Sequence, residues 1–328
     1  MKKRILLAAI AAIMGTAVAM AQQIAVVSES GSTDVYQTLK EAIEGASDGS
    51  VIYLPGGGFQ IHDSVKITKR LCIIGIGHKA KTENVDGNTM ISGNLFFNEG
   101  SSGSSVMGCY ISGTVYIGND GSSVNNVLIK YCNLNAINVK NSLCTKTLIN
   151  QNYIRNVSDF NSAEVTILNN IAHSFITING GTVSNNIIVS NATPHGLSSS
   201  WHWCLEASNC NISNNIFLNA GSDGYHRGSN CVVYGNMVRS NWGDDYINVG
   251  STDWNTIFTN YNSGKITPAS EFKFTKDYQQ YSDCGIYGGD GFSDGALPPV
   301  PFIVSKSIPE QTDASGKLNI KIRVKAGE

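Results

Sequence analysis

The chain has 328 residues, of which 41% are hydrophobic and only 15% are charged, and its formal net charge is −2. A charged fraction this far below about one quarter excludes a disordered polyelectrolyte and a long helical rod. The near-neutral charge argues against nucleic acid as a partner, because proteins that bind nucleic acid carry a basic surface.

The first residues have the features of a secretory signal peptide. Residues 2–4 are basic, residues 6–13 form a short apolar run, and Ala19–Ala21 is an A-x-A cleavage site. We therefore expect residues 1–21 to be removed and a mature chain beginning at Gln22 to be exported to the periplasm, the cell surface or the medium. The apolar run is too short to span a bilayer and no other long apolar stretch follows, so we expect no membrane span.

Residues 35–46 predict an amphipathic helix, because their apolar side chains fall on one helical face. These residues are Val35, Leu39, Ala42, Ile43 and Ala46. Strand-like runs follow at 51–59 and 65–75. We expect the helix to cap the first strands of a repetitive β structure.

Short β-like segments recur through the middle of the chain. Each contains a β-branched residue, and an Asn usually follows three positions later. The intervals between successive β-branched residues are 20, 18, 16, 29 and 21 residues. The β-branched residues are Ile129, Ile149, Ile167, Val183, Ile212 and Val233.

This spacing is typical of a β solenoid in which each repeat stacks on the next at about 4.8 Å. We expect the β-branched residues to form one buried stack and the recurrent Asn side chains to form a hydrogen-bonded ladder at a turn. A leucine-rich repeat is a weaker alternative, because the repeated positions hold Ile, Val and Asn rather than Leu. A β-sandwich rich in Asn remains the other alternative.

Eight cysteines are present, and an even number in an exported chain permits disulfides. None of them forms a C-x-x-C motif, and several occupy apolar positions of the repeat. We interpret these as buried free thiols that pack as small apolar side chains.

An acidic group near the end of the repeat is a candidate cation site. Aligning the repeats at Asn215 and Asn236 places Asp223 over Asp244, with Asp245 adjacent. Stacking would bring the two carboxylates to about 5 Å, and three Asp together with loop carbonyls could hold Ca²⁺. The alternative is a solvated pair of turn aspartates.

The same alignment places Tyr225 over Tyr246, and we expect both to bind substrate. The 29-residue interval contains an insertion at about 192–206 that includes Trp201, His202 and Trp203. The repeat register places this loop beside the acidic group, and exposed Trp rings stack well on sugars. The alternative is a lid in which the Trp pair folds back over the solenoid.

Residues after Pro301 change pattern and predict a small β tail at 302–328. A strand at 302–308 and a turn at 313–316 precede a second strand in which apolar and polar residues alternate. Its apolar residues are Leu318, Ile320, Ile322 and Val324, which predicts a half-buried strand.

The helix at 35–46, the run at 49–59 and the Leu-Cys-Ile-Ile-Gly-Ile-Gly run at 71–77 resemble the entry to a protein of the pectate-lyase-like superfamily. Residues 278–301 resemble the end of such proteins secreted by Gram-negative gut bacteria, so the resemblance covers about residues 33–301. It implies an all-β, right-handed parallel β-helix at 22–301 with an N-terminal capping helix and a C-terminal β tail. Lyases, hydrolases, epimerases, adhesins and proteins without known activity share this fold.

Lyases that the chain resembles use an Arg or Lys to remove the proton α to a uronate carboxylate, which Ca²⁺ or a protein cation neutralises. No Lys lies between Lys146 and Lys265, so this catalytic role falls on Arg227, with His226 beside it. We therefore expect an exported protein that binds or processes an acidic polysaccharide, with uronate lyase activity as one form of processing. The alternative is a non-catalytic surface, structural or adhesin-like protein.

Overall fold

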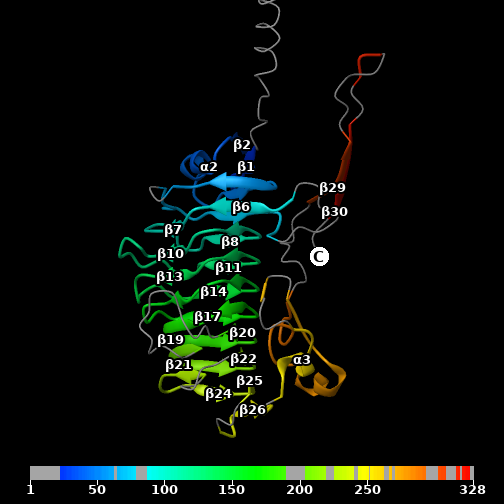
Figure 1. Cartoon of the computed structure of the whole chain (residues 1–328). Helices are drawn as coiled ribbons and strands as arrows, with labels where there is room; N and C mark the ends of the chain where they lie inside the picture. The colour runs from blue at the N-terminus through cyan, green and yellow to red at the C-terminus, as the bar shows by residue number, and fades with distance from the viewer. Residues whose placement is uncertain are drawn as a thin grey trace, which may run out of the picture.

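Figure 1 shows the fold of the whole chain in a computed structural model. The structure describes residues 23–62, 65–78, 87–189, 204–218, 225–239, 243–250, 252–261, 266–267, 270–292, 302–307, 315–317 and 320–325. These residues are mostly β structure, and most strands pair in parallel in two large sheets.

One sheet has ten strands, and their order in space follows their order in the chain. Each strand pairs in parallel with the strand that follows it in the sheet. The strands are β4 (Gly57–Gln60), β6 (Thr89–Ser92), β9 (Tyr110–Ile111), β12 (Asn133–Leu134), β15 (Tyr153–Ile154), β18 (Ile171–His173), β20 (Ile187–Val189), β22 (Ile216–Leu218), β25 (Asn236–Val238) and β26 (Tyr246–Asn248).

The second sheet has sixteen strands and divides into two arms. Two long strands, β19 (Phe175–Ser184) and β21 (Leu205–Ser213), belong to both arms and join them. Arm 1 also contains β3 (Val51–Tyr53), β5 (Cys72–Ile74), β8 (Ser105–Met107), β11 (Leu128–Lys130), β14 (Thr147–Asn150), β17 (Val165–Leu168) and β24 (Val232–Tyr234). Arm 2 also contains β7 (Leu95–Phe97), β10 (Val115–Ile117), β13 (Ile137–Val139), β16 (Ser158–Asp159) and β23 (His226–Arg227).

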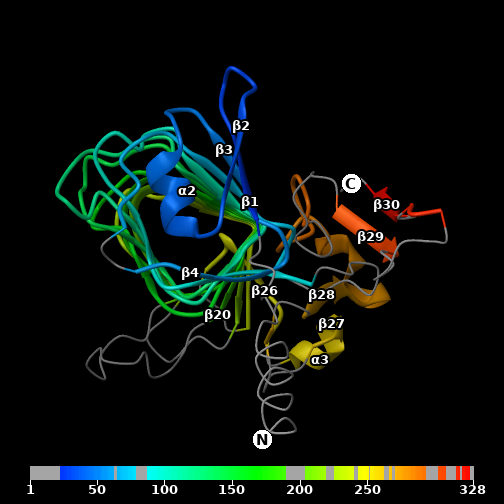
Figure 2. The ribbon, with the colours of Figure 1, turned by 90° about the horizontal axis from the view of Figure 1, so that it is seen from above.

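From β6 to β25 the chain visits the ten-stranded sheet, arm 2 and arm 1 in the same repeated order. We call one such passage a circuit. Seen from above, the strands of successive circuits lie over one another around a common interior (Figure 2). Each circuit therefore presents one inward-facing and one outward-facing set of side chains on each of three faces.

The predicted stack of β-branched residues is confirmed in arm 1. Each member pairs in register with the next, from Ile129 to Val233. The first five have no exposed surface, and only Val233, in the last strand of the arm, is partly exposed. The same column continues toward the N-terminus through Val106, Ile73 and Ile52, so the core extends beyond the segments in which the repeat is visible.

The predicted Asn ladder is also present, at the corner between arm 1 and the ten-stranded sheet. In Asn170, the side-chain Nδ2 donates to Asn186 Oδ1 at 2.9 Å and to the Ile149 carbonyl at 3.0 Å. The same contacts link Asn186 to Asn215, and each of these side chains is completely buried. The five members of the ladder are Asn152, Asn170, Asn186, Asn215 and Asn236.

The residue before each ladder Asn turns the chain with a left-handed backbone. This residue is itself an Asn at 169, 185 and 214, with φ between 54° and 58°. Asn tolerates this region better than most residues, and Gly235 fills the same position before Asn236 with φ of 65°. In each Asn-Asn pair the first residue therefore makes the corner and the second makes the ladder.

An amphipathic helix covers the N-terminal end of the circuits, as predicted (Figure 2). The helix α2 is shorter than expected, however, and spans Leu39–Gly45. It begins there because Thr38 and Glu41 form a reciprocal capping box. Val35 instead lies in strand β2 (Thr33–Tyr36), which pairs antiparallel with β1 (Ile24–Val27) at the edge of arm 1.

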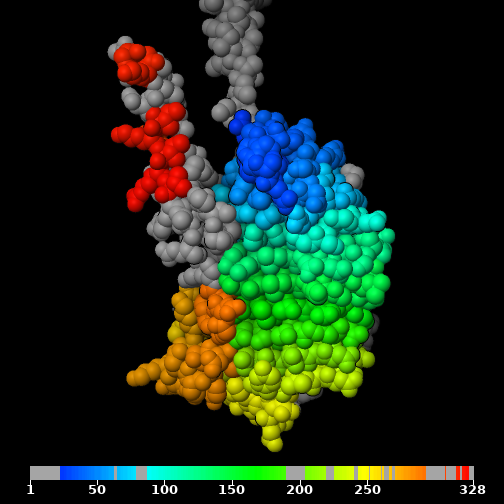
Figure 3. Space-filling model, turned by 180° about the vertical axis from the view of Figure 1, so that it is seen from behind, coloured from blue at the N-terminus to red at the C-terminus, as the bar shows by residue number. Residues whose placement is uncertain are grey.

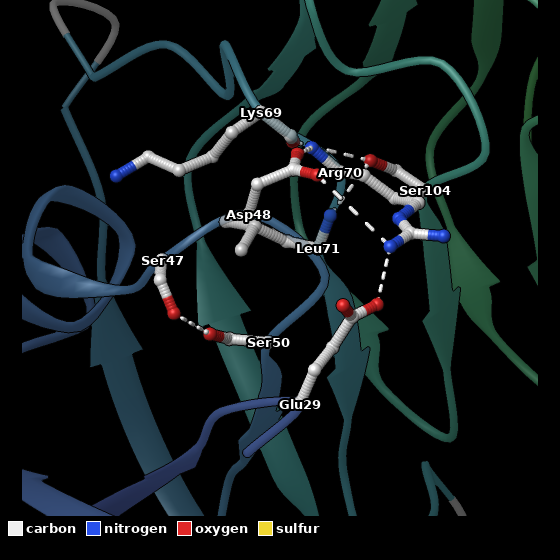
Figure 4. Close-up of polar contacts among 8 residues, drawn as sticks. All are labelled: Glu29, Ser47, Asp48, Ser50, Lys69, Arg70, Leu71 and Ser104. Carbon is white, nitrogen blue, oxygen red and sulfur yellow. Dashed lines mark hydrogen bonds and ion pairs between the residues drawn. The ribbon is translucent and has the colours of Figure 1, made fainter.

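Polar contacts join this cap to the first circuits (Figure 4). Arg70 forms an ion pair with Glu29, and its backbone N–H donates to Asp48 Oδ1 at 2.8 Å. The backbone N–H of Leu71 donates to Ser104 Oγ at 3.0 Å, across to the next circuit. The exposed ion pair adds little stability, so the backbone donors are the important part of this junction.

The C-terminal segment lies beside the later circuits (Figure 3), where it packs on the outer face of the later strands of the ten-stranded sheet. It comprises α3 (Trp254–Ile257), β27 (Phe258–Asn260), β28 (Glu271–Phe274) and the 3-10 helix η1 (Lys276–Tyr281). Its apolar residues pack on outward-facing side chains of that sheet, including Ile171, Ile187 and Ile216. Hydrogen bonds from Asn169 and Asn185 to the carbonyls of residues 283, 285, 286 and 288 fix the position of the segment.

The expected C-terminal β tail consists of β29 (Phe302–Ser307) and β30 (Lys321–Lys325), which pair antiparallel. The prediction that its second strand is half-buried is wrong. Ile320, Ile322 and Val324 are 53–55% exposed. Alternation of apolar residues reports burial only where a second layer covers one face, and among the described residues none covers this hairpin.

The cysteines at apolar positions of the repeat are free thiols, as predicted, and the other cysteines are free as well. Six are buried, and Cys72 and Cys231 are partly exposed.

We predict that Ile167→Asp lowers the free energy of unfolding by more than about 3 kcal/mol, because it places an unpaired charge inside the stack. The control is Thr166→Asp, whose side chain lies on the outward face of the same strand. Chemical denaturation of both variants measures the difference. Equal stability of the two variants would contradict the assignment of the inward face.

Removing one rung of the ladder is expected to be costly as well. Asn186→Ala removes the acceptor of the buried Asn170 backbone N–H and the side-chain donor to the Ile167 carbonyl, which we expect to cost about 2–4 kcal/mol. Asn211→Ala, at an exposed position of β21, is the matched control and should change stability by less than about 0.5 kcal/mol. Thermal and urea unfolding of the two variants would test this.

Candidate functional site

The structure describes six of the ten residues predicted to form a site. Tyr225, His226 and Arg227 lie at the last strand of arm 2, and residues 244–246 lead into β26. Asp223, Trp201, His202 and Trp203 lie outside the described residues, so their predicted roles stay predictions.

The outward side of arm 2 gathers polar, charged and aromatic side chains into one column. Seven members come from the seven strands of arm 2, and Lys66 precedes the isolated bridge between Ile67 and Phe97. The register shifts between β19 and β21 around Ile176, which is the one aliphatic member. At the inter-strand spacing the column extends for roughly 30 Å. Its members are Lys66, Phe96, Tyr116, Asn138, Asp159, Ile176, Glu206 and Arg227.

The N-terminal end of this column is aromatic and cationic. The rings of Phe96 and Tyr116 stack with centroids 4.9 Å apart and planes 7° from parallel. Lys66 Nζ lies 3.4 Å from the centroid of the Phe96 ring, and Lys140 Nζ lies 5.7 Å from that of Tyr116. Each ammonium is attracted to an electron-rich ring face, so this end presents two positioned positive charges.

The middle of the column carries two carboxylates. The hydroxyl of Thr177 donates a hydrogen bond to Asp159, which fixes the orientation of this carboxylate. Glu206 Oε2 is buried and has no hydrogen-bond partner among the described residues. A buried oxygen with unused acceptor capacity is a position at which a ligand hydroxyl or a cation could bind.

The C-terminal end of the column is Arg227, and His226 precedes it at the inward-facing position that pairs with the core residue Leu205. His226 Nε2 lies 2.8 Å from the Ala207 carbonyl, which can only accept, so Nε2 carries the proton. Burial lowers the pKa of His226, although the hydrogen bond to Ala207 opposes this effect. The imidazole is therefore neutral near pH 7, and Arg227, exposed beside it and opposite Glu206, supplies a positive charge.

The predicted alignment of Tyr225 with Tyr246 is wrong. Tyr225 precedes β23 in arm 2, and its carbonyl accepts from the Leu205 N–H. Tyr246 instead pairs with Asn236 in the ten-stranded sheet, because the chain adds β26 directly to β25 without passing through the other two faces. The interval of 21 residues between the two tyrosines matched the repeat, but the last passage of the chain is shorter than a circuit.

The same shift removes the register argument for stacking Asp223 on Asp244. Asp244 and Asp245 are exposed at the start of β26, next to the ten-stranded sheet rather than arm 2. Among the described residues, no group of three or more His, Cys, Asp or Glu side chains is arranged to hold a metal ion. Ca²⁺ therefore stays a prediction that depends on Asp223, which lies outside those residues.

The N-terminal half of the column was missed by sequence reasoning. Phe96 and Tyr116 are separated by 20 residues, which is the interval of the repeat. However, the Asn that marks later repeats is absent there, and Cys109 and Cys132 occupy the equivalent buried positions. The signal was an aromatic pair at the repeat interval, which a search beginning at the Asn positions does not detect.

No helix among the described residues combines the length and the apolar character needed to cross a membrane. Comparison with known proteins gives no match among family models, curated proteins or solved structures.

The lowered pKa values of two buried histidines predict a pH-dependent stability. Burial lowers the pKa of His226 and of His173, so between their folded-state values and about 6.5 the unfolded chain binds more protons. The two histidines should therefore contribute fully to the free energy of unfolding above pH about 6.5, and this contribution should fall as the pH drops below that value.

The measurement is the Tm as a function of pH from 7.5 to 5, taken for wild type and for His226→Gln. We expect a shallower dependence in the variant. The exposed His62 provides the control, and His62→Gln should retain the wild-type dependence. Parallel curves for wild type and His226→Gln would contradict the prediction.

Proposed function

We propose that this chain is an exported right-handed parallel β-helix protein of the pectate-lyase-like superfamily. The repeated visit to three faces in one order, the parallel register and the internal Asn ladder support this assignment. Right-handed crossovers are the rule for parallel strands of one sheet, in about 98% of cases. The helix across the first circuit is the kind of cap that such a stack requires.

We propose further that the outward column of arm 2 binds an extended acidic polysaccharide. The observation that carries this proposal is the alignment of the column itself, which places bonding groups at regular steps along a straight face. A linear polymer fits a linear array of donors and acceptors. On the ten-stranded sheet, by contrast, the outer face of the later strands, from β15 to β25, is covered by the C-terminal segment.

The charges along the column favour an acidic glycan. Lys66 and Lys140 at one end and Arg227 at the other can pair with uronate carboxylates, Arg227 with the two-pronged geometry that suits them. Asp159 and Glu206 lie between these cations and can accept hydrogen bonds from sugar hydroxyls. The half-buried ring of Tyr116, which stacks on the buried Phe96, presents an apolar edge to the sugar.

Uronate lyase activity is the second candidate, and the neutral imidazole of His226 favours it. β-Elimination needs a base for the proton α to the carboxylate and a cation that stabilises the resulting enolate. Arg227, on the outward face, can neutralise the carboxylate. His226 lies at the inward position that pairs with Leu205, so its Nδ1 accepts the proton only after the ring turns toward the open end of the stack. Arg227 is then the electrostatic group rather than the base, which reverses the role implied by the resemblance.

The binding proposal predicts that Lys140→Ala weakens binding of an acidic polysaccharide by about 1–2 kcal/mol, or roughly tenfold. The matched control is Lys130→Ala, because Lys130 also lies over a ring, that of Tyr131, but on arm 1. Calorimetric titration with polygalacturonate and alginate, and with a neutral glucan, measures both. Equal losses in the two variants would place binding elsewhere.

A lyase would release products that absorb in the band of unsaturated uronates. We expect such absorbance from wild type on at least one acidic polysaccharide and its loss in His226→Gln with binding retained. Binding without any absorbance, across the same panel with and without Ca²⁺, would instead support the adhesin-like alternative.

A further inference from the structure

Two cysteines of arm 1 lie side by side in the last two strands of the arm. Asn211 of β21 pairs with Val232 of β24. Cys210 comes directly before Asn211 and Cys231 directly before Val232, so the two cysteines lie opposite each other in the same register. The backbone N–H of Cys210 lies 3.5 Å from Cys231 Sγ. Neighbouring residues of parallel strands have Cα atoms about 4.8 Å apart, within the range of about 4.4–6.8 Å that a disulfide spans.

Both side chains point inward, so their Cβ atoms lie on the same side of the strands. Cys210 belongs to the buried core, with 3% of its surface exposed, and Cys231 packs against that core. The hydrogen bonds of the two Sγ atoms involve backbone groups, with Cys210 Sγ donating to the Ser208 carbonyl and Cys231 Sγ to the Ala207 carbonyl. Among the described residues, neither sulfur belongs to a group of three or more His, Cys, Asp or Glu side chains that could hold a metal ion.

A second pair of neighbouring cysteines in the same molecule provides a contrast. Cys109 and Cys132 also lie one circuit apart, but both are completely buried in the middle of the stack. Each Sγ donates to the carbonyl two residues earlier, that of Met107 or of Lys130. An oxidant dissolved in water has no access to these thiols in the folded chain, whereas Cys231 is partly exposed at the open end.

We propose that Cys210 and Cys231 are a redox-active pair that closes into a disulfide in the folded protein. The reaction is two successive thiol–disulfide exchanges with a small oxidised disulfide such as oxidised glutathione. The Cys231 thiolate attacks one glutathione sulfur, and the first glutathione leaves as a thiol. Cys210 then loses its proton and attacks the Cys231 sulfur, and the second glutathione leaves. Two protein thiols are oxidised and one glutathione disulfide is reduced.

The order of attack follows from exposure. The partly exposed Cys231 meets the oxidant first, whereas burial raises the pKa of Cys210 to about 11 and keeps it protonated. Once the mixed disulfide has formed, Cys210 is held beside it and the second step is intramolecular.

The closed loop of residues 210–231 carries Tyr225, His226 and Arg227. Within the described residues, β23 and β24 each pair with a single strand, β21, so these last strands are held from one side only. The disulfide would tie β24 covalently to β21 and restrict the C-terminal end of the arm 2 column. Oxidation would therefore stabilise the end of the stack and order the His226–Arg227 region, whatever ligand that region binds.

The test uses the full chain, purified under reducing conditions, incubated with oxidised glutathione and then blocked with an alkylating reagent. Peptide mass spectrometry should show Cys210 linked to Cys231, with Cys109 and Cys132 alkylated only after unfolding. The oxidised protein should have a Tm several degrees above that of the reduced protein, and a reductant should abolish the difference.

Cys231→Ser should show no Tm shift on oxidation, whereas Cys72→Ser, which alters the other partly exposed thiol, should retain it. Three results would overturn the proposal. They are a stable mixed disulfide of Cys231 with glutathione, a linkage between other cysteines, or a Cys210–Cys231 disulfide that leaves the Tm unchanged or lower. The mass spectrum of wild type decides the linkage even if a variant fails to fold.

Discussion

The corner formed by consecutive asparagines is the interaction on which the regular part of the molecule depends. A parallel strand needs another strand as its hydrogen-bonding partner, and here that partner arrives only after a full circuit. The chain must therefore turn at the same angle each time. A left-handed Asn makes the turn, and the next Asn satisfies buried backbone groups of both neighbouring circuits. Because the corners are fixed, the strands of arm 1 pair in one register, and their Ile and Val side chains stack on one another.

Much of the fold could be predicted from the sequence, because the spacing and residue types of the repeat indicate how successive strands stack. The Ile129–Val233 column, the ladder and the helical cap all follow from local patterns that recur. The failures have a common physical cause, which is that a repeat interval does not show where the chain leaves the repeat. Tyr246 sits at the expected distance from Tyr225 but belongs to another face. Alternation in the C-terminal tail likewise predicted burial that needs a covering layer.

The candidate site was also predicted only in part, because residue types are visible in the sequence and strand pairing is not. His226 and Arg227 were identified from residue type, and Arg227 lies on the outward face with other charged groups, whereas His226 pairs in register with the inward-facing Leu205. The cations and rings at the opposite end of that face were not identified, since the early circuits use Cys where later ones use Asn. Register across seven strands, rather than any local motif, is what aligns Lys66 with Arg227. A functional surface built in this way is visible only once the strands are paired.

The contacts of the C-terminal segment have a consequence for how such a chain can change in evolution. Simple repeat arrays gain and lose units easily, because each unit contacts only its neighbours. Here the segment at 283–288 reaches back to Asn169, Asn185 and Asn214, which lie in three successive circuits. Duplicating or deleting a circuit between these asparagines would move them relative to residues 283–288 and break the hydrogen bonds between them. The C-terminal segment therefore restricts the number of circuits in this part of the array.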